Sequence, residues 1–118
     1  KGKKVLIPLI NKEIPIIQDE YVSMDFGTGC LKITPAHDIN DYEIGLRHNL
    51  PVIDILDKFA CLNDKAQILI GEERFSARKK IVKMLADSGN LDREESYTSQ
   101  VGYSERTNAV IEPRLSLQ

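Results

Sequence analysis

Two carboxylates, an ammonium group and a hydroxyl are concentrated in one short stretch of the sequence. Asp38 and Asp41 stand three residues apart, close behind Lys32 and Thr34. If residues 30–34 form a strand, Lys32 and Thr34 share one of its faces, because strand side chains alternate. An ammonium group could contact a phosphate or ester oxygen of a ligand, and a carboxylate at the strand end could hold a ligand's amine. The pattern predicts a small-ligand site with an ammonium-binding acid.

A glycine-rich turn precedes this strand. Gly27 and Gly29 flank Thr28, and glycine adopts backbone dihedrals closed to other residues, so a ligand can approach closely. The turn is too short for a dinucleotide-binding fingerprint. Phe26 would be a core residue in most proteins, but beside a ligand cleft it could stack on a base or sugar.

Each candidate also has a purely structural interpretation. Asp38 could cap the following helix, and Asp41 could be a first-turn acid favoured by the helix dipole. His37 could act as a general base, or it could hold the chain in place by hydrogen bonding. His37 and the two aspartates match no zinc signature, so we expect no metal. No nucleophile elbow indicates covalent catalysis, and neither cysteine has a clear histidine partner in the sequence.

The elements that must position these residues follow from hydrophobic periodicity. Residues 39–50 and 72–88 carry apolar side chains at helical spacing, with Gly89 as a stop signal and Asp38 or Asn40 as the first helix's cap. The expected buried faces comprise Ile39, Tyr42, Leu46 and Leu50 on the first helix, and Phe75, Val82, Leu85 and Ala86 on the second. The expected strands are residues 5–10 and 14–17 around a polar turn at 11–13, then 30–34 and 52–56, with shorter ones around 101–103 and 110–111. These elements predict an α+β domain whose short strands wrap into a barrel-like, mostly antiparallel or mixed sheet.

Composition sets broader limits. The 118 residues suit one domain, and the net charge of −2 gives no global positive field typical of a nucleic-acid binder. Cys30 and Cys61 make no disulfide framework, so we expect reduced, partly buried thiols in a cytoplasmic protein. The sequence has no run of membrane-spanning length. Two local basic clusters, interpreted as solvated surface, comprise Lys1, Lys3 and Lys4, and Arg74, Arg78, Lys79, Lys80 and Lys83.

The stretch FGTGCLKITPAHDINDYEIGLRHNLP, residues 26–51, resembles the second half of the editing insertion of the valyl-tRNA synthetase family. Isoleucyl- and leucyl-tRNA synthetases carry related versions of the Gly-Thr-Gly and His-Asp-x-x-Asp-Tyr patterns. The sequences KITPAHD and RHNLP are more similar to the valyl type. Residues 14–22, 74–79 and 101–118 are similar to further stretches of that family, so the resemblance covers nearly the whole chain.

The resemblance implies hydrolysis of the ester in threonyl-tRNA mischarged on tRNA(Val). Because threonine and valine are nearly isosteric, a hydrophobic synthetic pocket rejects threonine only weakly, and a second site must recognise the hydroxyl. It further implies that Asp38 accepts this hydroxyl, that Asp41 binds the α-ammonium, and that a positioned water attacks the carbonyl. The implied catalytic residues are Lys32, Thr34, Asp38 and Asp41, and the implied substrate-binding residues are Phe26, Gly27, Thr28, Gly29, His37, Asp38 and Asp41.

The chain departs from the complete family pattern in three motifs. The threonine-rich Thr-Thr-Arg-Pro-Glu-Thr segment and the His-Ile-Gly-His and Lys-Met-Ser-Lys-Ser signatures do not occur in it. We therefore expect residues 1–118 to form a single partial editing domain, with residues 92–118 leading back to the catalytic core. The expected partners are the tRNA(Val) 3′ end and the remainder of the synthetase; editing needs no cofactor, and ATP and Mg²⁺ belong to the catalytic domain. The alternatives are a non-catalytic aminoacyl-adenosine or tRNA-end binding module, an isoleucyl or leucyl relative, and a metal hydrolase.

Overall fold

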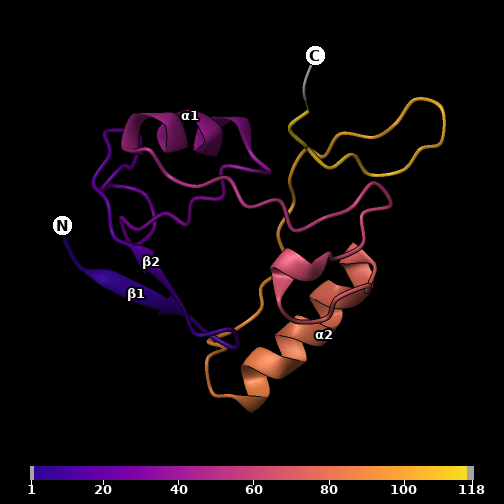
Figure 1. Ribbon diagram of the computed structural model, residues 1–118, viewed down its shortest axis with the longest axis horizontal. Helices are drawn as coiled ribbons and strands as arrows, with labels where there is room; N and C mark the ends of the chain where they lie inside the picture. Colours follow the sequence, from indigo (N-terminus) through magenta and orange to yellow (C-terminus); the bar gives the residue numbers. More distant parts are fainter. Residues whose placement is uncertain (1, 117–118) are drawn as a thin grey trace.

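The computed structural model describes residues 2–116 as an α+β arrangement of two α-helices, one short 3₁₀ helix and a two-stranded sheet (Figure 1). The predicted α+β class is confirmed. Within residues 2–116 the only sheet is this antiparallel pair, and it does not close into a barrel, so the barrel-like sheet stays a prediction. No helix of residues 2–116 has both the length and the apolar character needed to cross a bilayer.

The two strands form an N-terminal hairpin. β1 spans Lys4–Ile7 and β2 spans Lys12–Pro15, with Lys4 opposite Pro15 and Ile7 opposite Lys12. The predicted strands exist, but the connection runs over residues 8–11 rather than 11–13. Pro8 cannot donate to a ladder, and Leu9 and Asn11 adopt positive φ angles of 72° and 51°, so the chain reverses earlier than predicted and the turn ends at Asn11, the first of the polar residues.

Two other predicted strands do not form. Residues 30–34 and 52–56 run without ladder partners in the described part of the chain, apart from a single bridge between Leu56 and Leu62. A strand needs a neighbour to satisfy its backbone groups, and alternation of side chains alone does not supply one. Near the C-terminus, a bridge between Tyr103 and Val110 is all that represents the two shorter strands.

The first helix, α1, spans Ile39–His48; it begins at the predicted residue and ends two residues before the predicted residue 50. Asp38 is its N-cap and Asn49, with a left-handed φ of 54°, is its C-cap. The expected buried face is only partly correct: Tyr42 and Leu50 are half-buried, but Ile39 is 74% exposed and Leu46 is 66% exposed. Instead the helix buries Asp41, Ile44 and Gly45.

The close approach of Pro35 explains why α1 turns this other face inward. A Cβ placed on Gly45 would lie 3.0 Å from Cγ of Pro35, so only glycine lets the two segments meet without a shift. Ile44, next to Gly45, is fully buried. The chain before α1 therefore packs on the Gly45 face, and of the apolar stripe inferred from periodicity Ile39 and Leu46 face outward.

The second helix, α2, spans Arg74–Asp87, and the short 3₁₀ helix of Asp64–Ala66 precedes it in the chain (Figure 1). Glu73 caps its start by accepting hydrogen bonds from two amides of the first turn. Gly89, at φ 80°, ends it as predicted. The expected buried face is only partly correct. Phe75, Val82 and Leu85 are half-buried and Ala86 is exposed, while the one buried residue of α2 is Ala77.

Candidate functional site

The predicted polar site is centred on a bond between Thr34 and the first turn of α1. Oδ2 of Asp41 accepts a hydrogen bond from the Thr34 backbone N–H at 2.9 Å and another from the Thr34 hydroxyl at 3.3 Å. Asp41 is only 7% exposed, counting backbone and side chain together, and by this measure of the whole residue it is the one buried charged residue among residues 2–116. A buried carboxylate requires such donors because desolvation of an unpaired charge is costly. These two hydrogen bonds therefore hold Thr34, at the end of the segment that precedes α1, against the first turn of that helix.

Lys32 extends this pair into a chain of three polar groups. Its Nζ donates to Oγ1 of Thr34 at 3.1 Å, and the same hydroxyl donates onward to Asp41. A hydroxyl has one proton to donate and lone pairs to accept, so both contacts can coexist. The structure thus brings Lys32, Thr34 and Asp41 together as the sequence predicts, although residues 30–34 are not a strand.

One oxygen of Asp41 is not used by this arrangement. Among the described residues none donates a hydrogen bond to Oδ1, and no side-chain oxygen of the described part is both sealed from solvent and unpartnered. Oδ1 is therefore still reached by solvent. Asp41 forms no ion pair with residues 2–116, and it lines neither of the two surface hollows described below. Its observed partner is Thr34, and its role toward a ligand stays a prediction.

Asp38 has a clear structural role. Its Oδ1 accepts hydrogen bonds from the backbone N–H groups of Asn40 at 2.8 Å and Asp41 at 3.1 Å, which confirms the N-cap interpretation. Asn40 lies inside α1 and does not cap it. Asp38 itself is exposed, so its carboxylate is accessible from solvent at the same helix end as Asp41. Recognition of a substrate hydroxyl by Asp38 stays a prediction.

The glycine turn lies at the surface. Gly27 and Gly29 have φ angles of 57° and 74°, which glycine adopts freely, and the Gly29 N–H donates to the Phe26 carbonyl at 3.2 Å. Gly29 also packs against Met24, since a Cβ there would lie 3.1 Å from its Sδ. Phe26 is 83% exposed and the Thr28 hydroxyl accepts from the Cys30 N–H at 3.3 Å. The turn therefore presents an unpaired aromatic ring to solvent.

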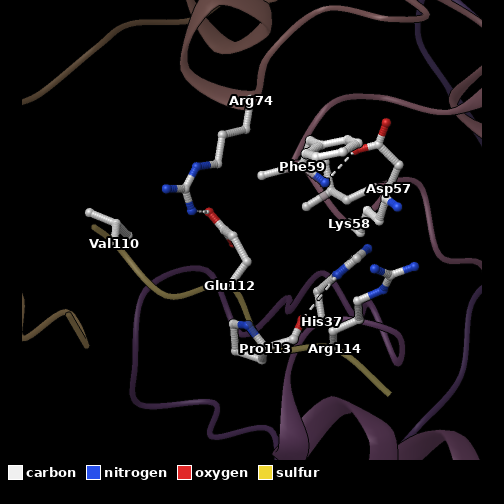
Figure 2. A pocket seen from close by; sticks show the side chains of 11 residues that line it. His37, Asp57, Lys58, Phe59, Arg74, Val110, Glu112, Pro113 and Arg114 are labelled. Atoms are coloured by element: carbon white, nitrogen blue, oxygen red, sulfur yellow. Dashed lines mark hydrogen bonds and ion pairs between the residues drawn. The ribbon is translucent and has the colours of Figure 1, made fainter. Parts of the chain in front are cut away.

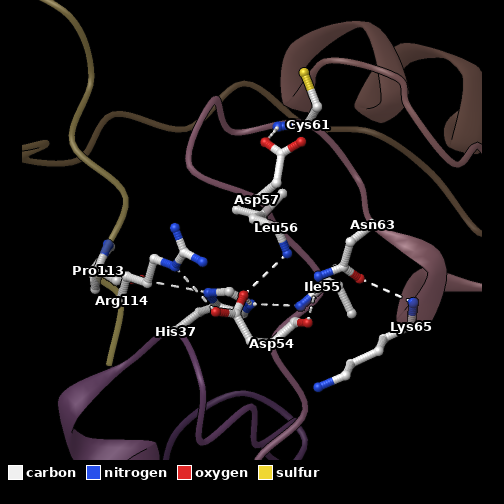
Figure 3. A network of polar contacts seen from close by, with 10 residues as sticks. All are labelled: His37, Asp54, Ile55, Leu56, Asp57, Cys61, Asn63, Lys65, Pro113 and Arg114. Carbon is white, nitrogen blue, oxygen red and sulfur yellow. Dashed lines mark hydrogen bonds and ion pairs between the residues drawn. The ribbon is translucent and has the colours of Figure 1, made fainter. Parts of the chain in front are cut away.

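His37 connects the site to two distant segments (Figure 3). Its Nδ1 lies 3.4 Å from the Pro113 carbonyl, and its Nε2 lies 3.5 Å from the Ile55 N–H and 3.6 Å from Oδ1 of Asp54. A tautomer with the proton on Nδ1 donates to Pro113 and accepts from Ile55, so the distances are mutually consistent. The His37 ring therefore forms hydrogen bonds, as one interpretation expected, but to Ile55 and Pro113 and not within residues 35–41; its role as a general base stays a prediction.

Asp54 is the anionic member of that network. Partial burial favours its neutral form, but the Leu56 N–H, which donates at 3.0 Å, and the Arg114 guanidinium, at 3.2 Å, outweigh this and lower the pKa of Asp54. The charged carboxylate holds residues 54–56 and the C-terminal segment on either side of His37 (Figure 3). Sequence reasoning missed this network because its members are far apart in the chain.

A hollow of about 310 Å³ opens beside His37 and was also missed (Figure 2). Arg74 and Glu112 form an ion pair of 2.7 Å on its wall, and Phe59, 71% exposed, carries the Lys58 ammonium 5.1 Å from its ring centre. Of the predicted site residues only His37 lines this hollow. The full lining comprises His37, Leu56, Asp57, Lys58, Phe59, Ala60, Arg74, Val110, Glu112, Pro113 and Arg114.

A second polar cluster fastens the loop after β2 to the end of α1. Asp19 accepts from Arg47 at 2.8 and 3.1 Å, lies 2.8 Å from Nε2 of His48, and accepts from the Tyr21 N–H at 2.8 Å. The Arg47 hydrogen bond is the largest cause that holds the pKa of Asp19 well below its usual value, and the same bond raises the pKa of Arg47. The Asp19 side chain is 5% exposed and lines an open hollow of about 690 Å³.

The cysteines are both free, as expected. Cys61 is half-buried, but Cys30 is exposed, so the expected partial burial is wrong for Cys30 because no strand neighbour covers it. Among residues 2–116, no three His, Cys, Asp or Glu side chains are grouped so that they could hold a metal ion.

Comparisons with known proteins place this chain in a family. Residues 1–107 match the family model described as leucyl-tRNA synthetase, editing domain. The chain is 57% identical over all 118 residues to a valine–tRNA ligase of Bacteroides thetaiotaomicron and covers 13% of it; it is 55% identical over all 118 residues to that of Bacteroides fragilis, covering 14%. The valine–tRNA ligase of Carboxydothermus hydrogenoformans is 55% identical over 117 residues, which are 99% of this chain and 13% of the relative. The chain thus spans only about 13% of the length of these curated relatives, and, because the family model matches most of it, it belongs to the leucyl-tRNA synthetase editing-domain family.

Proposed function

We propose that this chain is the ammonium-binding part of an editing domain of the valyl type, and that it hydrolyses the ester of threonine misattached to tRNA(Val). The family match and the three relatives named valine–tRNA ligase support the domain type. The single observation that carries the site assignment is the series of hydrogen bonds from Lys32 through Thr34 to Asp41. These bonds bring a cation, a hydroxyl and an acid together at the N-terminus of α1.

Asp41 is proposed to bind the α-ammonium of the misattached amino acid. Thr34 occupies Oδ2, which leaves Oδ1 as the acceptor for a substrate amine. Because Asp41 is 7% exposed, an ammonium group that reaches it becomes largely desolvated, and charge-assisted hydrogen bonds are strong in such surroundings. The two hydrogen bonds from Thr34 also orient the Asp41 carboxylate before substrate binds, so binding costs little additional conformational entropy at this side chain.

Asp38 is proposed to supply the discrimination between threonine and valine. Its Oδ1 is engaged with the α1 amides, and its second oxygen receives no hydrogen bond from the described residues. A threonine hydroxyl can donate to that oxygen, whereas a valine methyl group cannot. A site built to accept a hydroxyl rejects the analogue that lacks it, which a hydrophobic pocket of the same shape does not achieve.

Lys32 is proposed to act on the ester itself. Water adds to the ester carbonyl, the C–O bond to the terminal ribose breaks, and free threonine and the tRNA hydroxyl leave. The Lys32 ammonium, oriented by Thr34, is suited to stabilise the negative charge that develops on the carbonyl oxygen. The exposed ring of Phe26 is suited to stack on the terminal adenine.

The wider setting follows from the domain type and is part of the proposal. The partners are the 3′ end of tRNA(Val) and the remainder of a cytoplasmic synthetase, with residues 92–118 leading back to the catalytic core. Other segments of the synthetase are proposed to supply the strands that complete a barrel-like sheet. Editing needs no cofactor, whereas ATP and Mg²⁺ serve only valine activation in the catalytic domain.

A graft tests this proposal. The 118 residues replace the corresponding segment of the Bacteroides thetaiotaomicron valine–tRNA ligase, to which they are 57% identical. We expect the graft to deacylate threonyl-tRNA(Val) and Asp41→Asn to slow this by about 10–100-fold, since loss of a charge-assisted bond costs about 1.5–3 kcal/mol. ATP-dependent valine activation is the control and stays unchanged. Undiminished deacylation by Asp41→Asn would contradict the assignment of that residue.

A binding module without turnover is the second candidate. The observation that favours it is that the ring of His37, the candidate general base, contacts Pro113 and Ile55 and forms no hydrogen bond to Thr34 or Asp41. Such a module binds a non-hydrolysable threonyl-adenosine analogue but leaves threonyl-tRNA intact. Binding of the analogue and hydrolysis of threonyl-tRNA are both measured on the graft. The binding module predicts binding without hydrolysis. The editing proposal predicts both, and predicts that Asp41→Asn loses both together.

A further inference from the structure

One face of α2 concentrates positive charge that the internal contacts do not use. The helix carries five basic residues and one acidic residue, Asp87, in a protein whose net charge is −2. Arg78, Lys79 and Lys83 are exposed and form no ion pair with any residue between 2 and 116. We call these three residues the α2 basic face. The surrounding charges therefore leave them free for an external anion.

The other two basic residues of α2 already have partners. Arg74 is 2.7 Å from Glu112, and Lys80 is 2.6 Å from Glu72. The Glu72 carboxyl has its pKa lowered, first by this hydrogen bond from Lys80. Arg74 and Lys80 therefore stabilise the fold through ion pairs and are not part of the α2 basic face.

The three free cations lie on one side of the helix. At about 100° per residue, Arg78, Lys79 and Lys83 span an arc of about 140°, centred roughly opposite the buried Ala77. Lys79 and Lys83 are one turn apart and therefore adjacent on the surface. The Arg78 guanidinium lies 5.2 Å from the centre of the Phe75 ring, so cation–π contact restrains it in an outward-facing position.

We propose that the α2 basic face binds the phosphate backbone of duplex RNA, as found in the stem next to the 3′ end of a tRNA. The choice of tRNA as the natural duplex rests on the proposed editing function. Phosphate contacts from Lys and Arg position a protein on nucleic acid without reading its sequence. A row of exposed, unpaired cations on a straight helix suits a regularly charged polyanion of this kind.

An anionic membrane surface fits this face less well. Peripheral membrane helices combine a cationic face with a broad apolar face that enters the lipid. On α2 the larger apolar side chains of the same arc, Phe75 and Val82, are half-buried within the protein, and Phe75 is covered by the guanidiniums of Arg74 and Arg78. The exposed part of the helix is therefore cationic without an apolar wedge.

The proposal predicts how strongly the affinity for RNA should depend on salt concentration. Each phosphate neutralised on a duplex contributes about 0.9 to the slope of log K against log salt, so three contacts contribute about 2.7. Over the fourfold rise from 50 to 200 mM salt, this part of the slope weakens binding by about 40-fold. Neutralising the basic face removes that part and leaves any contribution from other charges.

The experiment measures binding of a fluorescent RNA duplex without an aminoacyl group to the full 118-residue chain. The variant is R78Q/K79Q/K83Q, because Gln has a helix propensity close to that of Lys and Arg. The control is K3Q/K65Q, which removes two exposed lysines that have no ion pair among residues 2–116 and lie outside α2. Circular dichroism at 222 nm checks that each protein keeps its helices. The same substitutions in the grafted ligase, assayed by the KM for threonyl-tRNA(Val), make the result independent of whether the isolated chain folds.

The expected result is a fall of about 2.7 in the salt slope for the triple variant, little change for K3Q/K65Q, and a KM raised at least tenfold in the graft. An unchanged slope in the triple variant overturns the proposal, as does an equal loss in the control, which would mean that charge acts diffusely. Binding to phosphatidylserine vesicles that is stronger than binding to RNA and is lost in the triple variant overturns the choice of partner. The duplex carries no ester, and Asp41→Asn is expected to bind it normally, so failure here is distinguishable from failure of the editing proposal.

Discussion

The bond between Asp41 and Thr34 sets a quantitative expectation for two substitutions at position 41. Asp41→Ala removes the acceptor for the half-buried Thr34 N–H and for its hydroxyl. Leaving a buried donor unsatisfied costs about 1–3 kcal/mol. Loss of a first-turn acid adds about 0.3–1 kcal/mol through the helix dipole. The free energy of unfolding should therefore fall by about 1.5–4 kcal/mol in Asp41→Ala.

Asp41→Asn keeps an amide oxygen in place of Oδ2 and so retains an acceptor for the Thr34 N–H. Only the charge is lost, and the expected cost is about 0.5–1.5 kcal/mol, the difference between a charge-assisted and a neutral bond. Urea unfolding followed by circular dichroism measures both variants, and hydrogen exchange of the Thr34 amide reports the bond directly. Equal destabilisation by Ala and Asn, or Thr34 exchange as fast in the parent chain as in Asp41→Ala, would refute the reasoning.

Three further substitutions test the packing around this site. Ile44→Ala removes the fully buried side chain of α1 and should lower the free energy of unfolding by about 2–5 kcal/mol in the urea assay; a change below about 0.5 kcal/mol would show that α1 does not pack as described. Gly45→Ala places a Cβ 3.0 Å from Pro35 and should cost about 1–3 kcal/mol, whereas an unchanged midpoint would mean that the segment moves freely. Because the pKa of Asp19 is lowered in the folded state, its contribution is complete above its unfolded pKa of about 3.9 and is lost as the pH falls below it. Asp19→Asn should therefore flatten the loss of stability below about pH 4, and an unaltered acid limb would contradict this.

The ends of the helices could be predicted because their signals are local. Asp38 lies directly before α1 and Asn49 directly after it, and Gly89 follows α2 in the same way. Each acts through hydrogen bonds or dihedrals within one turn of its own position. The contact of Lys32 with Thr34 was predictable for the same reason, since the two residues are only two apart in the chain.

The buried face of α1 could not be predicted from periodicity. Ile39 and Leu46 recur at helical spacing, yet both are exposed, while Gly45 and Asp41 face inward. The orientation depends on where Pro35 meets the helix, and spacing within the helix carries no information about that contact.

The long-range polar networks were also beyond sequence reasoning. His37 contacts Pro113 across 76 positions, and Asp19 contacts Arg47 across 28. No spacing rule connects such residues, because the fold alone brings them together. One usable signal was the position of Arg47 in the last turn of α1, where a cation is favoured, although that signal does not name its acid partner.

The central claim is that Asp41 binds the α-ammonium of the misattached amino acid. Its most direct test removes the charge of the Asp41 carboxylate, the charge of the substrate ammonium, or both. The grafted ligase and its Asp41→Asn variant are each assayed for kcat/KM on threonyl-tRNA(Val) and on N-acetyl-threonyl-tRNA(Val), which lacks the ammonium. We predict that acetylation slows the parent graft by about 10–100-fold and leaves Asp41→Asn nearly unaffected, as for two groups that contact each other. Equal sensitivity to acetylation in both proteins would contradict the account.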